Sequence, residues 1–409
     1  MLAQAVILVG GLGTRLGELT ARTPKPLLPV AGRPFLEHLI QEVSRYGFER
    51  VTLLAGRFGD RVRDTYDGRV LSGLAVDVLV EPTAMGTGGA LAHAVRHGRL
   101  DPVFLLMNGD SWIDIDLSAV IRHWEAARRT NPELQVQLLL QTVPDAARYG
   151  TVEMSGRKVT AFLEKSPESA KRVGQINAGV YVIDRRAVAG IAADRPSSLE
   201  GDVLPALVAQ GRVTGLLAPD SAYFIDIGLP ETYREAGAEL TRRRTRPALF
   251  LDRDGTLNVD RGYTHRVAGL VWQPDAQAAI RHANAAGYYV FVVTNQAGVA
   301  RGYYAEADVV AFHRAMQAAL IDAGAHVDAW EWCPHHADGT VAAYRRACRR
   351  RKPQPGMIDD LLSAWPVDTG RSLMIGDSDD DMRAAKAAGL VGVRYVGGSL
   401  LDLVRRHIE

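Results

Sequence analysis

Cysteine is almost absent from this sequence, whose 409 residues include two, Cys333 and Cys348. Two cysteines cannot build the disulfide framework of a small secreted protein. Long apolar runs are absent as well, since a stretch such as 288–293 is far below the ~20 residues that span a bilayer. The first residues lack the basic and long apolar regions of a signal peptide. We therefore expect a cytoplasmic protein with no membrane partner.

An excess of charge of either sign is also missing, because 48 Lys and Arg balance 47 Asp and Glu. The chain has no overall field that would attract nucleic acid, so we expect no nucleic-acid partner. At roughly 150 residues per domain, the length predicts two or three domains. The apolar share of 47% lets each domain bury a core of its own.

Short apolar runs alternate with amphipathic stretches along the first part of the chain. This alternation predicts an α/β fold, doubly wound on a mainly parallel, Rossmann-type sheet. The expected strands are 5–9, 51–55, 75–80, 103–107, 136–140 and 180–183, and the expected helices are 35–46, 88–96 and 117–129.

An arginine-rich segment, 241–247, interrupts this alternation and ends in Pro247. It has no interleaved aromatic residues, so we interpret it as a solvated linker rather than an RNA-binding patch. The linker separates a domain at 1–240 from a second α/β domain at 248–409. Strands are expected there at 248–251, 289–293, 372–375 and 392–395, and helices at 275–286, 305–323 and 379–388.

A glycine-rich turn follows the first predicted strand, at the edge where open α/β sheets bind ligands. It contains Gly10, Gly11, Gly13, Thr14 and Arg15. Glycine lets backbone N–H groups approach phosphate oxygens closely, and arginine adds a fixed cation. The turn is neither a Walker loop nor a GxGxxG motif, so a turn without a ligand remains the alternative.

Further motifs suited to bind phosphate groups and their metal ion follow along the chain. Lys25 stands between two prolines, 81–90 is a second glycine-rich turn, and Asp110 ends an apolar strand. Asp226 supplies another carboxylate within 224–228. Asp110 and Asp226 together are suited to hold Mg²⁺, which prefers carboxylate oxygen and shares its other positions with phosphates.

With these motifs, residues 1–240 resemble the sugar-1-phosphate nucleotidyltransferases, and most closely the heptose-1-phosphate guanylyltransferases. The resemblance implies that a sugar 1-phosphate attacks the α-phosphorus of a nucleoside triphosphate and expels pyrophosphate. It implies that Arg15 and Lys25 neutralise the triphosphate while the two aspartates carry Mg²⁺.

The same resemblance implies the remaining ligands of this domain. The sugar phosphate is expected at Glu164, Lys165 and Asn177, and the nucleotide at Glu81, Gly86, Thr87, Gly88 and Gly109. One departure is that the proline often found after Glu-Lys is shifted by one, to Pro167. Each residue also has an ordinary structural interpretation, and a catalytically silent domain of the same fold is the joint alternative.

The second domain opens with Asp252 and Asp254 directly after an apolar strand. This spacing lets Asp252 act as a nucleophile toward phosphorus while Asp254 serves as general acid and then as base. Cations must offset the repulsion between carboxylate and phosphate. Asp252, Asp254 and Asp377 are candidate Mg²⁺ ligands, and Lys352 is a candidate phosphate clamp. The stretch 294–296 offers the Thr294 hydroxyl and the Asn295 amide to phosphoryl oxygens.

These motifs resemble the haloacid-dehalogenase (HAD) superfamily over 248–409, and in detail the heptose-1,7-bisphosphate 7-phosphatases, with histidinol phosphatases as the nearest relatives. The resemblance implies that Arg301 and Arg351 approach the substrate phosphates. We expect the basic run 345–352 to attract a doubly phosphorylated sugar, although a solvated basic loop is the ordinary interpretation.

A structural Zn²⁺ site is the family feature that this sequence matches incompletely. Cys333, His335 and Cys348 correspond to three ligands, and Arg350 stands in the fourth position. Structural zinc sites are almost always four-coordinate. Both a zinc site completed by another donor and a loop ordered by its own packing therefore remain open.

Together the two domains predict a bifunctional, Mg²⁺-dependent enzyme that makes a nucleotide-activated heptose for bacterial surface polysaccharide such as lipopolysaccharide. Its partners would be sugar phosphates and a nucleoside triphosphate, GTP by the closest resemblance. One alternative is a transferase for another sugar 1-phosphate and base fused to a histidinol-phosphatase-like domain. Another is a nucleotide-sensing scaffold without turnover. The sequence leaves a homo-oligomer open.

Overall fold

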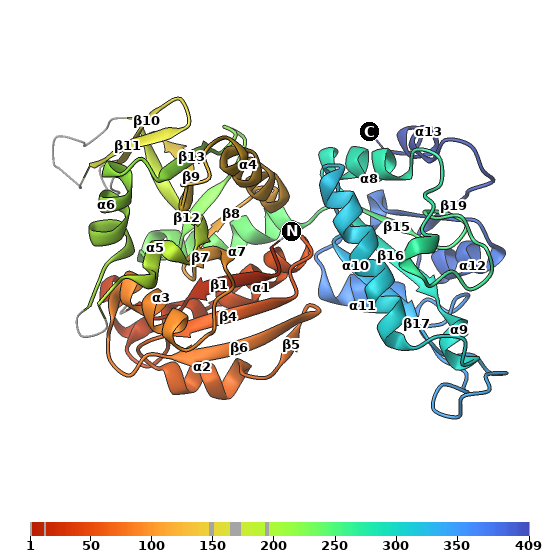
Figure 1. Ribbon diagram of the computed structural model, residues 1–409. Coiled ribbons are helices and arrows are strands. Elements are labelled where there is room, and N and C mark those ends of the chain that lie inside the picture. The colour runs from red at the N-terminus through yellow and green to blue at the C-terminus, as the bar shows by residue number, and fades with distance from the viewer. Residues whose placement is uncertain (1, 12–13, 147–150, 164–172, 193–195, 409) are drawn as a thin grey trace. The chain divides into compact units, whose positions relative to one another are not determined.

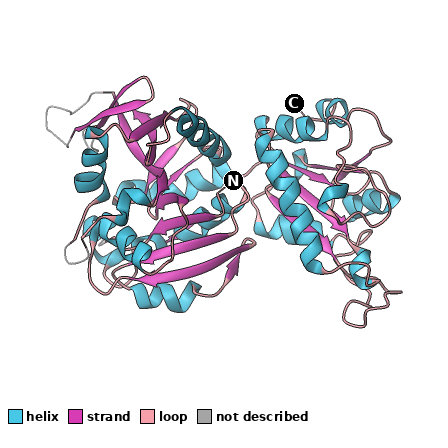
Figure 2. Ribbon diagram, viewed as in Figure 1, coloured by secondary structure: helices cyan, strands magenta, loops and turns pink. Residues whose placement is uncertain are grey.

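The structure, a computed structural model, describes residues 2–11, 14–146, 151–163, 173–192 and 196–408. The chain divides into two compact units. The first comprises Met1–Ser44 and Phe48–Glu239, and the second comprises Arg45–Gly47 and Leu240–Glu409. Strands and helices alternate in both (Figure 2), which confirms the predicted α/β class.

One large sheet organises the first unit (Figure 1). Its strands are β1 (Gln4–Leu8), β4 (Arg50–Ala55), β5 (Val70–Leu71), β6 (Leu74–Val80), β7 (Val103–Asn108), β9 (Val136–Val143), β10 (Thr151–Ser155), β11 (Lys158–Leu163), β12 (Gly174–Asp184) and β13 (Val213–Leu217). They are ordered β10-β11-β13-β9-β12-β7-β1-β4-β6-β5. The strands β7, β1, β4 and β6 are parallel, as expected, but β12 runs antiparallel to both neighbours, so the sheet is mixed.

Helices and short strands complete the first unit. They are η1 (Thr14–Thr20), η2 (Lys25–Leu27), β2 (Pro29–Val30), β3 (Arg33–Pro34), α1 (Phe35–Ser44), α2 (Gly59–Tyr66), α3 (Gly86–Arg96), β8 (Ser111–Ile113), α4 (Leu117–Thr130), α5 (Arg186–Ala189), η4 (Leu199–Val203), α6 (Leu204–Ala209), β14 (Phe224–Asp226) and α7 (Pro230–Arg244). One core cluster joins Leu106 of β7 to Leu91 of α3 and Leu204 of α6. Burial by helices explains why the central strands are almost continuously apolar.

The second unit has a parallel sheet in the order β17-β16-β15-β18-β19. The strands are β15 (Ala248–Leu251), β16 (Tyr289–Asn295), β17 (Ala329–Cys333), β18 (Leu373–Gly376) and β19 (Val391–Arg394). The helices are η5 (Val267–Gly269), α8 (Ala276–Ala285), α9 (Ala297–Ala300), α10 (Glu306–Asp322), α11 (Gly356–Ala364), η6 (Thr369–Arg371), α12 (Asp379–Ala387) and α13 (Leu400–Arg405). Leu249 and Leu251 pack in the cluster of α8, α10 and α13, whereas Phe250 packs with α11 and α12. Alternate residues of β15 thus serve opposite faces, as doubly wound sheets require.

The structure corrects the expected solvated linker at 241–247. Residues 241–244 form the end of α7, and Arg244 is buried. Arginine favours helix, and positive charge near a helix C-terminus is stabilising, so this composition extends the helix until Pro247 approaches.

None of the helices in the described ranges combines the length and the apolar composition needed to cross a membrane.

Candidate active sites

In the second unit the predicted catalytic residues meet at one edge of the sheet. Asp252 directly follows β15, Asp377 directly follows β18, and Thr294 lies near the end of β16. These three strands are parallel neighbours, so their carboxyl ends meet at the same edge. Ligands of open α/β sheets bind there.

Lys352 is the cation closest to the expected nucleophile. Its Nζ lies 2.5 Å from Asp252 Oδ1 and 2.6 Å from Asp381 Oδ1, and it donates to the backbone oxygen of Val293 at 2.8 Å. Burial raises the pKa of Asp252 to about 7, while Lys352 opposes this rise. Burial by itself would lower the pKa of Lys352, but the two carboxylates raise it above its ordinary value. A buried ammonium therefore lies beside Asp252, the expected nucleophile.

Asp252, Asp377 and Asp381 form an acidic cluster whose ligand atoms lie within 4.8 Å of one another. Burial, followed by repulsion from Asp381, raises the pKa of Asp377. Gly255 permits this approach: its φ is +86°, and a Cβ there would lie 2.1 Å from Asp377 Oδ2. Crowded carboxylate oxygens of this kind fit a hard divalent cation such as Mg²⁺.

Asp254, which we expect to bind the metal together with Asp252 and Asp377, contributes no side-chain oxygen to that cluster, and its role as a metal ligand stays a prediction. Its oxygens accept hydrogen bonds from Arg253 Nη2 at 2.6 Å, Gln296 Nε2 at 2.8 Å and Asn258 Nδ2 at 3.0 Å. These donors hold the carboxylate, and Asp381 joins the cluster instead. The sequence interpretation passed over Arg253 as a spacer between the aspartates, although it is completely buried.

Asn295 has a different place from the one predicted. Its Nδ2 donates to the backbone oxygen of Lys352, and its Oδ1 accepts from the backbone N–H of Lys352, both at 3.0 Å. It therefore fixes the loop that carries Lys352. The Thr294 hydroxyl accepts from Gln296 Nε2 at 3.0 Å. Asn295 thus supports the position of Lys352. Thr294 supports Gln296, which in turn donates to Asp254.

Arg301 and Arg351 lie close enough to His336 to act on it electrostatically. Burial lowers the pKa of this histidine, and repulsion from Arg351 and then Arg301 lowers it further. Arg351 Nη1 also donates to the backbone oxygen of His335 at 3.4 Å. Arg301 and Arg351, which we expect to bind substrate phosphates, therefore both lie near His336.

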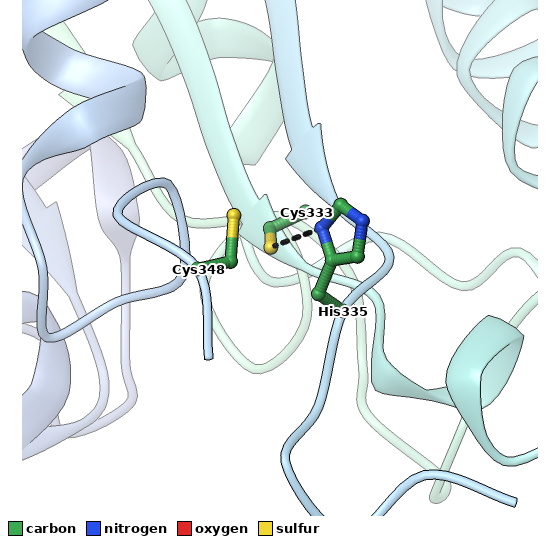
Figure 3. Close-up of side chains that lie close together, drawn as sticks. All are labelled: Cys333, His335 and Cys348. Atoms are coloured by element: carbon green, nitrogen blue, oxygen red, sulfur yellow. Dashed lines mark hydrogen bonds between the residues drawn. The ribbon is translucent and has the colours of Figure 1, made fainter. Parts of the chain in front are cut away.

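Cys333, His335 and Cys348 converge as the sequence suggested (Figure 3), with ligand atoms within 4.8 Å of one another. Cys333 Sγ lies 3.7 Å from His335 Nδ1, and burial raises the pKa of the Cys333 thiol to about 11. The Arg350 guanidinium pairs with Glu331, and its Nε lies 3.3 Å from Asp360 Oδ2. These carboxylates offset the charge of Arg350. Two sulfurs and one imidazole are a donor set that Zn²⁺ favours.

In the first unit a separate two-stranded sheet brings the predicted carboxylates together. Strands β8 and β14 are antiparallel, with Asp226 opposite Ser111 and therefore next to Asp110. Lys25 Nζ lies 2.6 Å from Asp110 Oδ2 and 3.2 Å from Asp226 Oδ1. The paired carboxylates suit Mg²⁺, and in this structure the ammonium neutralises them.

Two predicted nucleotide-facing glycines also have packing roles. A Cβ on Gly10 would lie 3.1 Å from Glu81 Oε1, and one on Gly109 would lie 2.3 Å from the backbone oxygen of Leu8. Glu81 accepts from the backbone N–H of Met85 at 2.9 Å, and burial raises the pKa of its carboxyl. The carboxyl end of β1 is thus closely packed around these residues.

The second glycine-rich turn contacts Ser197. The backbone N–H groups of Gly88 and Gly89 donate to the Ser197 oxygen at 2.8 and 3.2 Å. A Cβ on Gly86 would lie 2.5 Å from that oxygen, and its φ of +70° also favours glycine. Close backbone approach therefore explains these glycines without a nucleotide.

Asn177 and Thr87 belong to one partly buried hydrogen-bond network that the sequence interpretation did not foresee. Asn177 Nδ2 donates to Tyr181 Oη at 2.6 Å, and Tyr181 Oη donates to Glu200 Oε1 at 2.8 Å. Thr87 Oγ1 donates to Glu200 Oε2 at 3.2 Å. Burial, and then the Glu200 charge, raise the pKa of Tyr181 well above its ordinary value. The available signal for this network was that Asn177 and Tyr181 are polar residues four positions apart in the otherwise mainly apolar strand β12.

The other predicted ligands of this unit are Gly11, Gly13, Thr14, Arg15, Glu164 and Lys165. Arg15 and Gly11 are exposed. Gly13, Glu164, Lys165 and the Thr14 side chain lie outside the described residues.

The two units define a nucleotidyl transferase joined to a HAD-type hydrolase, two enzyme classes. A family described as nucleotidyl transferase matches residues 4–243, and one described as HAD-hydrolase-like matches residues 349–400. The chain therefore belongs to the nucleotidyl transferase family and carries a HAD-like domain in addition. Both predicted resemblances are confirmed.

Individual relatives narrow this assignment. The D-glycero-beta-D-manno-heptose-1,7-bisphosphate 7-phosphatase of Rhodopseudomonas palustris is 56% identical over 161 residues, 39% of this chain and 89% of that protein. The D-glycero-alpha-D-manno-heptose 1-phosphate guanylyltransferase of Aneurinibacillus thermoaerophilus is 33% identical, over 58% of this chain and 98% of that protein. The crystal structure of HddC from Yersinia pseudotuberculosis complexed with GMP-PN is 29% identical, with a TM-score of 0.50, over 58% of this chain and all of that one.

Proposed function

We propose that this chain is a bifunctional enzyme of nucleotide-heptose synthesis. Its second unit removes the 7-phosphate of D-glycero-D-manno-heptose 1,7-bisphosphate, and its first unit transfers GMP from GTP to the resulting heptose 1-phosphate. The product is GDP-heptose, a precursor of surface polysaccharide. The observation that carries the proposal is that both units place acidic and cationic side chains together. One matches a relative named for a heptose 1,7-bisphosphate, as the beta anomer, and the other a relative named for a heptose 1-phosphate, as the alpha anomer. We assign the transferase to 1–240 and the phosphatase to 248–409, both in the cytoplasm.

In the phosphatase, an oxygen of Asp252 attacks the phosphorus of the 7-phosphate and forms an aspartyl-phosphate. Asp254 gives a proton to the departing sugar oxygen and then takes one from the water that hydrolyses the intermediate. Lys352 holds positive charge beside the nucleophile at 2.5 Å. Mg²⁺ held by Asp252, Asp377 and Asp381 would offset the negative charge of the phosphoryl group.

Arg253, Asn258 and Gln296 orient Asp254 for its two proton transfers, because all three donate to its oxygens. Arg301 and Arg351 lie near His336 and are suited to receive the second phosphate of the substrate.

In the transferase, the phosphate of heptose 1-phosphate attacks the α-phosphorus of GTP, and pyrophosphate leaves. Arg15 and Lys25 neutralise the triphosphate, and Mg²⁺ held by Asp110 and Asp226 would stabilise the charge of the transition state. Glu164, Lys165 and Asn177 bind the sugar phosphate. Gly10, Gly11, Gly13, Thr14 and Glu81 belong to the nucleotide side, together with Gly86, Thr87, Gly88 and Gly109.

The direct test incubates the full chain with heptose 1,7-bisphosphate, GTP and Mg²⁺ and measures phosphate, pyrophosphate and GDP-heptose. All three products are expected. Omitting GTP should leave phosphate release alone, and supplying heptose 1-phosphate with GTP should give pyrophosphate and GDP-heptose without free phosphate. A failure to release either phosphate or pyrophosphate would contradict the proposal.

The base is tested by offering heptose 1-phosphate with each of the four ribonucleoside triphosphates. GTP is expected to give the highest kcat/KM. A higher kcat/KM with UTP would show that the nucleotide substrate is UTP rather than GTP, and the chain would still be a nucleotidyltransferase.

A further inference from the structure

A buried histidine, His313, lies next to the arginine that holds Asp254. It belongs to α10 and is 6% exposed. Its Nε2 lies 3.3 Å from Arg253 Nη1. A single side chain, that of Arg253, therefore lies between His313 and the proposed acid and base of the phosphatase.

The guanidinium of Arg253 divides its donors between Asp254 and two further acceptors. Nε and Nη2 donate to Asp254 Oδ1 at 3.1 and 2.9 Å, and Nη2 also donates to Oδ2 at 2.6 Å. Nη2 donates in addition to the backbone oxygen of Thr264 at 2.8 Å. Since these bonds use Nε and Nη2, the remaining nitrogen, Nη1, is the one that faces His313.

This contact defines the protonation of His313. An arginine carries donors alone, so Nε2 must accept, and the proton of the neutral imidazole lies on Nδ1. Burial lowers the pKa of His313 well below its ordinary value, and repulsion from Arg253 lowers it further. His313 is therefore a neutral acceptor that does not compete with Asp254 for the positive charge of the guanidinium.

Aromatic neighbours hold both side chains in place. The His313 ring stacks on Trp330 of β17, with centroids 4.7 Å apart and an interplanar angle of 24°. Trp330 Nε1 donates to Gln317 Oε1 at 3.2 Å. Arg253 Cζ lies 4.7 Å from the centroid of the Phe312 ring, within the range of a cation–π contact. This packing favours the orientation in which Nε2 points at Arg253.

Stacking alone does not require a histidine at position 313, because an apolar side chain would also fill the space beside Trp330. An apolar side chain would, however, take the acceptor away from Arg253 Nη1. Arg253 is completely buried, and a buried donor that loses its acceptor costs free energy. The ring nitrogen is thus the feature that this position requires.

We propose that His313 is a positioning residue of the phosphatase, which holds Arg253 in the orientation that places Asp254 for its proton transfers. This inference rests on the proposed phosphatase function and deepens it. It assigns His313 no contact with the substrate and leaves the proton transfers to Asp254.

The test compares His313→Leu and His313→Gln with the unchanged full chain, using heptose 1,7-bisphosphate as substrate. Leucine removes the acceptor, so Asp254 should be held less well and kcat for phosphate release should fall about tenfold. KM should stay within about twofold, because the lost interaction acts in the transition state rather than in substrate binding. Glutamine offers an amide oxygen near the position of Nε2, so His313→Gln should keep kcat within about threefold.

A second substrate separates proton donation from a general loss of structure. The leaving group of 4-nitrophenyl phosphate departs without a proton, whereas the sugar oxygen takes one from Asp254. The ratio kcat/KM includes no step after the leaving group has departed. His313→Leu should therefore lower kcat/KM about tenfold for the sugar bisphosphate and less than about twofold for 4-nitrophenyl phosphate.

Leu320→Ala is the matched control for packing, because Leu320 is a completely buried residue of the same helix. It should lower the unfolding temperature and leave kcat and KM unchanged when activity is measured well below that temperature.

Three results would overturn the role of His313: an unchanged kcat in His313→Leu, an equal loss of kcat/KM with both substrates, or a failure of glutamine to restore kcat. If the unchanged chain hydrolyses 4-nitrophenyl phosphate but not the sugar bisphosphate, the proposed function fails, and the inference that rests on it fails with it.

Discussion

The two units expose their charged residues to different degrees. In the second unit the side chains of Lys352 and Asp252 are 4% and 10% exposed. In the first unit the Asp110 and Asp226 side chains are 36% and 25% exposed around Lys25. Charges in a buried site interact more strongly, and leaving one of them unpaired there costs more.

This difference follows from how each site is built. The phosphatase residues stand at the ends of adjacent parallel strands, inside the fold. The transferase carboxylates stand on a small separate sheet, β8 and β14, beside a loop that carries Lys25. An open site suits a reaction that joins two large substrates, whereas a buried one suits the transfer of a single phosphoryl group. The predictions below test this difference.

Asp252→Asn should separate the two units most clearly. The amide cannot act as the nucleophile, so phosphate release from heptose 1,7-bisphosphate should fall by a factor on the order of 10⁴. Pyrophosphate release from GTP and heptose 1-phosphate should not change. Parallel product assays measure both, and an equal loss of both activities would contradict the independence of the sites.

Asp110→Asn is the corresponding change in the transferase. Losing one proposed metal-binding carboxylate should reduce pyrophosphate release about 10³-fold, with phosphate release unchanged as the internal control. A nucleotide-sensing scaffold would instead lose affinity for GTP and show no turnover to lose. Calorimetric titration with GTP beside the rate assay distinguishes these outcomes.

Lys352→Met and Lys25→Met compare stability in the two units. Removing Lys352 leaves two buried carboxylates without their cation, so the free energy of unfolding of the second unit should fall by about 3–5 kcal/mol. Removing Lys25 should cost about 1 kcal/mol, because its partners are more exposed. Differential scanning calorimetry of the full chain measures both. If both variants lost the same free energy of unfolding, the different exposure of the two sites would have no effect on how much each lysine stabilises its unit.

Gln296→Leu should have a smaller effect confined to the phosphatase. It removes one of the donors that orient Asp254 and leaves Arg253 and Asn258 in place. We expect kcat to fall about tenfold, with KM nearly unchanged. A large rise in KM without a change in kcat would assign Gln296 to substrate binding instead.

The smallest effect on phosphatase turnover is expected from a substitution in the group formed by Cys333, His335 and Cys348. Protein purified without added zinc should carry about one Zn²⁺ per chain, and Cys348→Ser should lose it with little change in phosphate release. Metal analysis by mass spectrometry measures the content. Metal-free protein with an ordered loop would favour the alternative in which packing alone holds Cys333, His335 and Cys348.

Much of the fold followed from the sequence, because apolar strands buried on both faces are easily recognised. The strand predicted at 248–251 matches β15, and the alternation of strands and helices was confirmed in both units. The short strands β8 and β14 were not predicted, since three-residue strands carry little periodicity. The end of α7 was taken for a linker because its arginines were interpreted by charge rather than by helix propensity.

The candidate sites were predicted unevenly. The sequence indicated Asp252, Asp377 and Lys352, and the structure brings all three together. It did not indicate the donors around Asp254, because Arg253, Asn258 and Gln296 acquire that role only through contacts between separate segments. The role of Asp254 as a metal ligand stays a prediction, because its side chain lies outside the acidic cluster and the structure holds no ion.

The pairing of β8 with β14 has a consequence for biosynthesis. Asp226 lies 201 positions after Lys25 in the chain, so their contact closes a very large loop at an entropic cost that grows only slowly with its length. A nascent polypeptide that stops before β14 holds one of the two acidic groups. Competence for transfer therefore arises late in synthesis of the first unit, and truncated fragments of that unit are expected to be inactive however well their early strands fold.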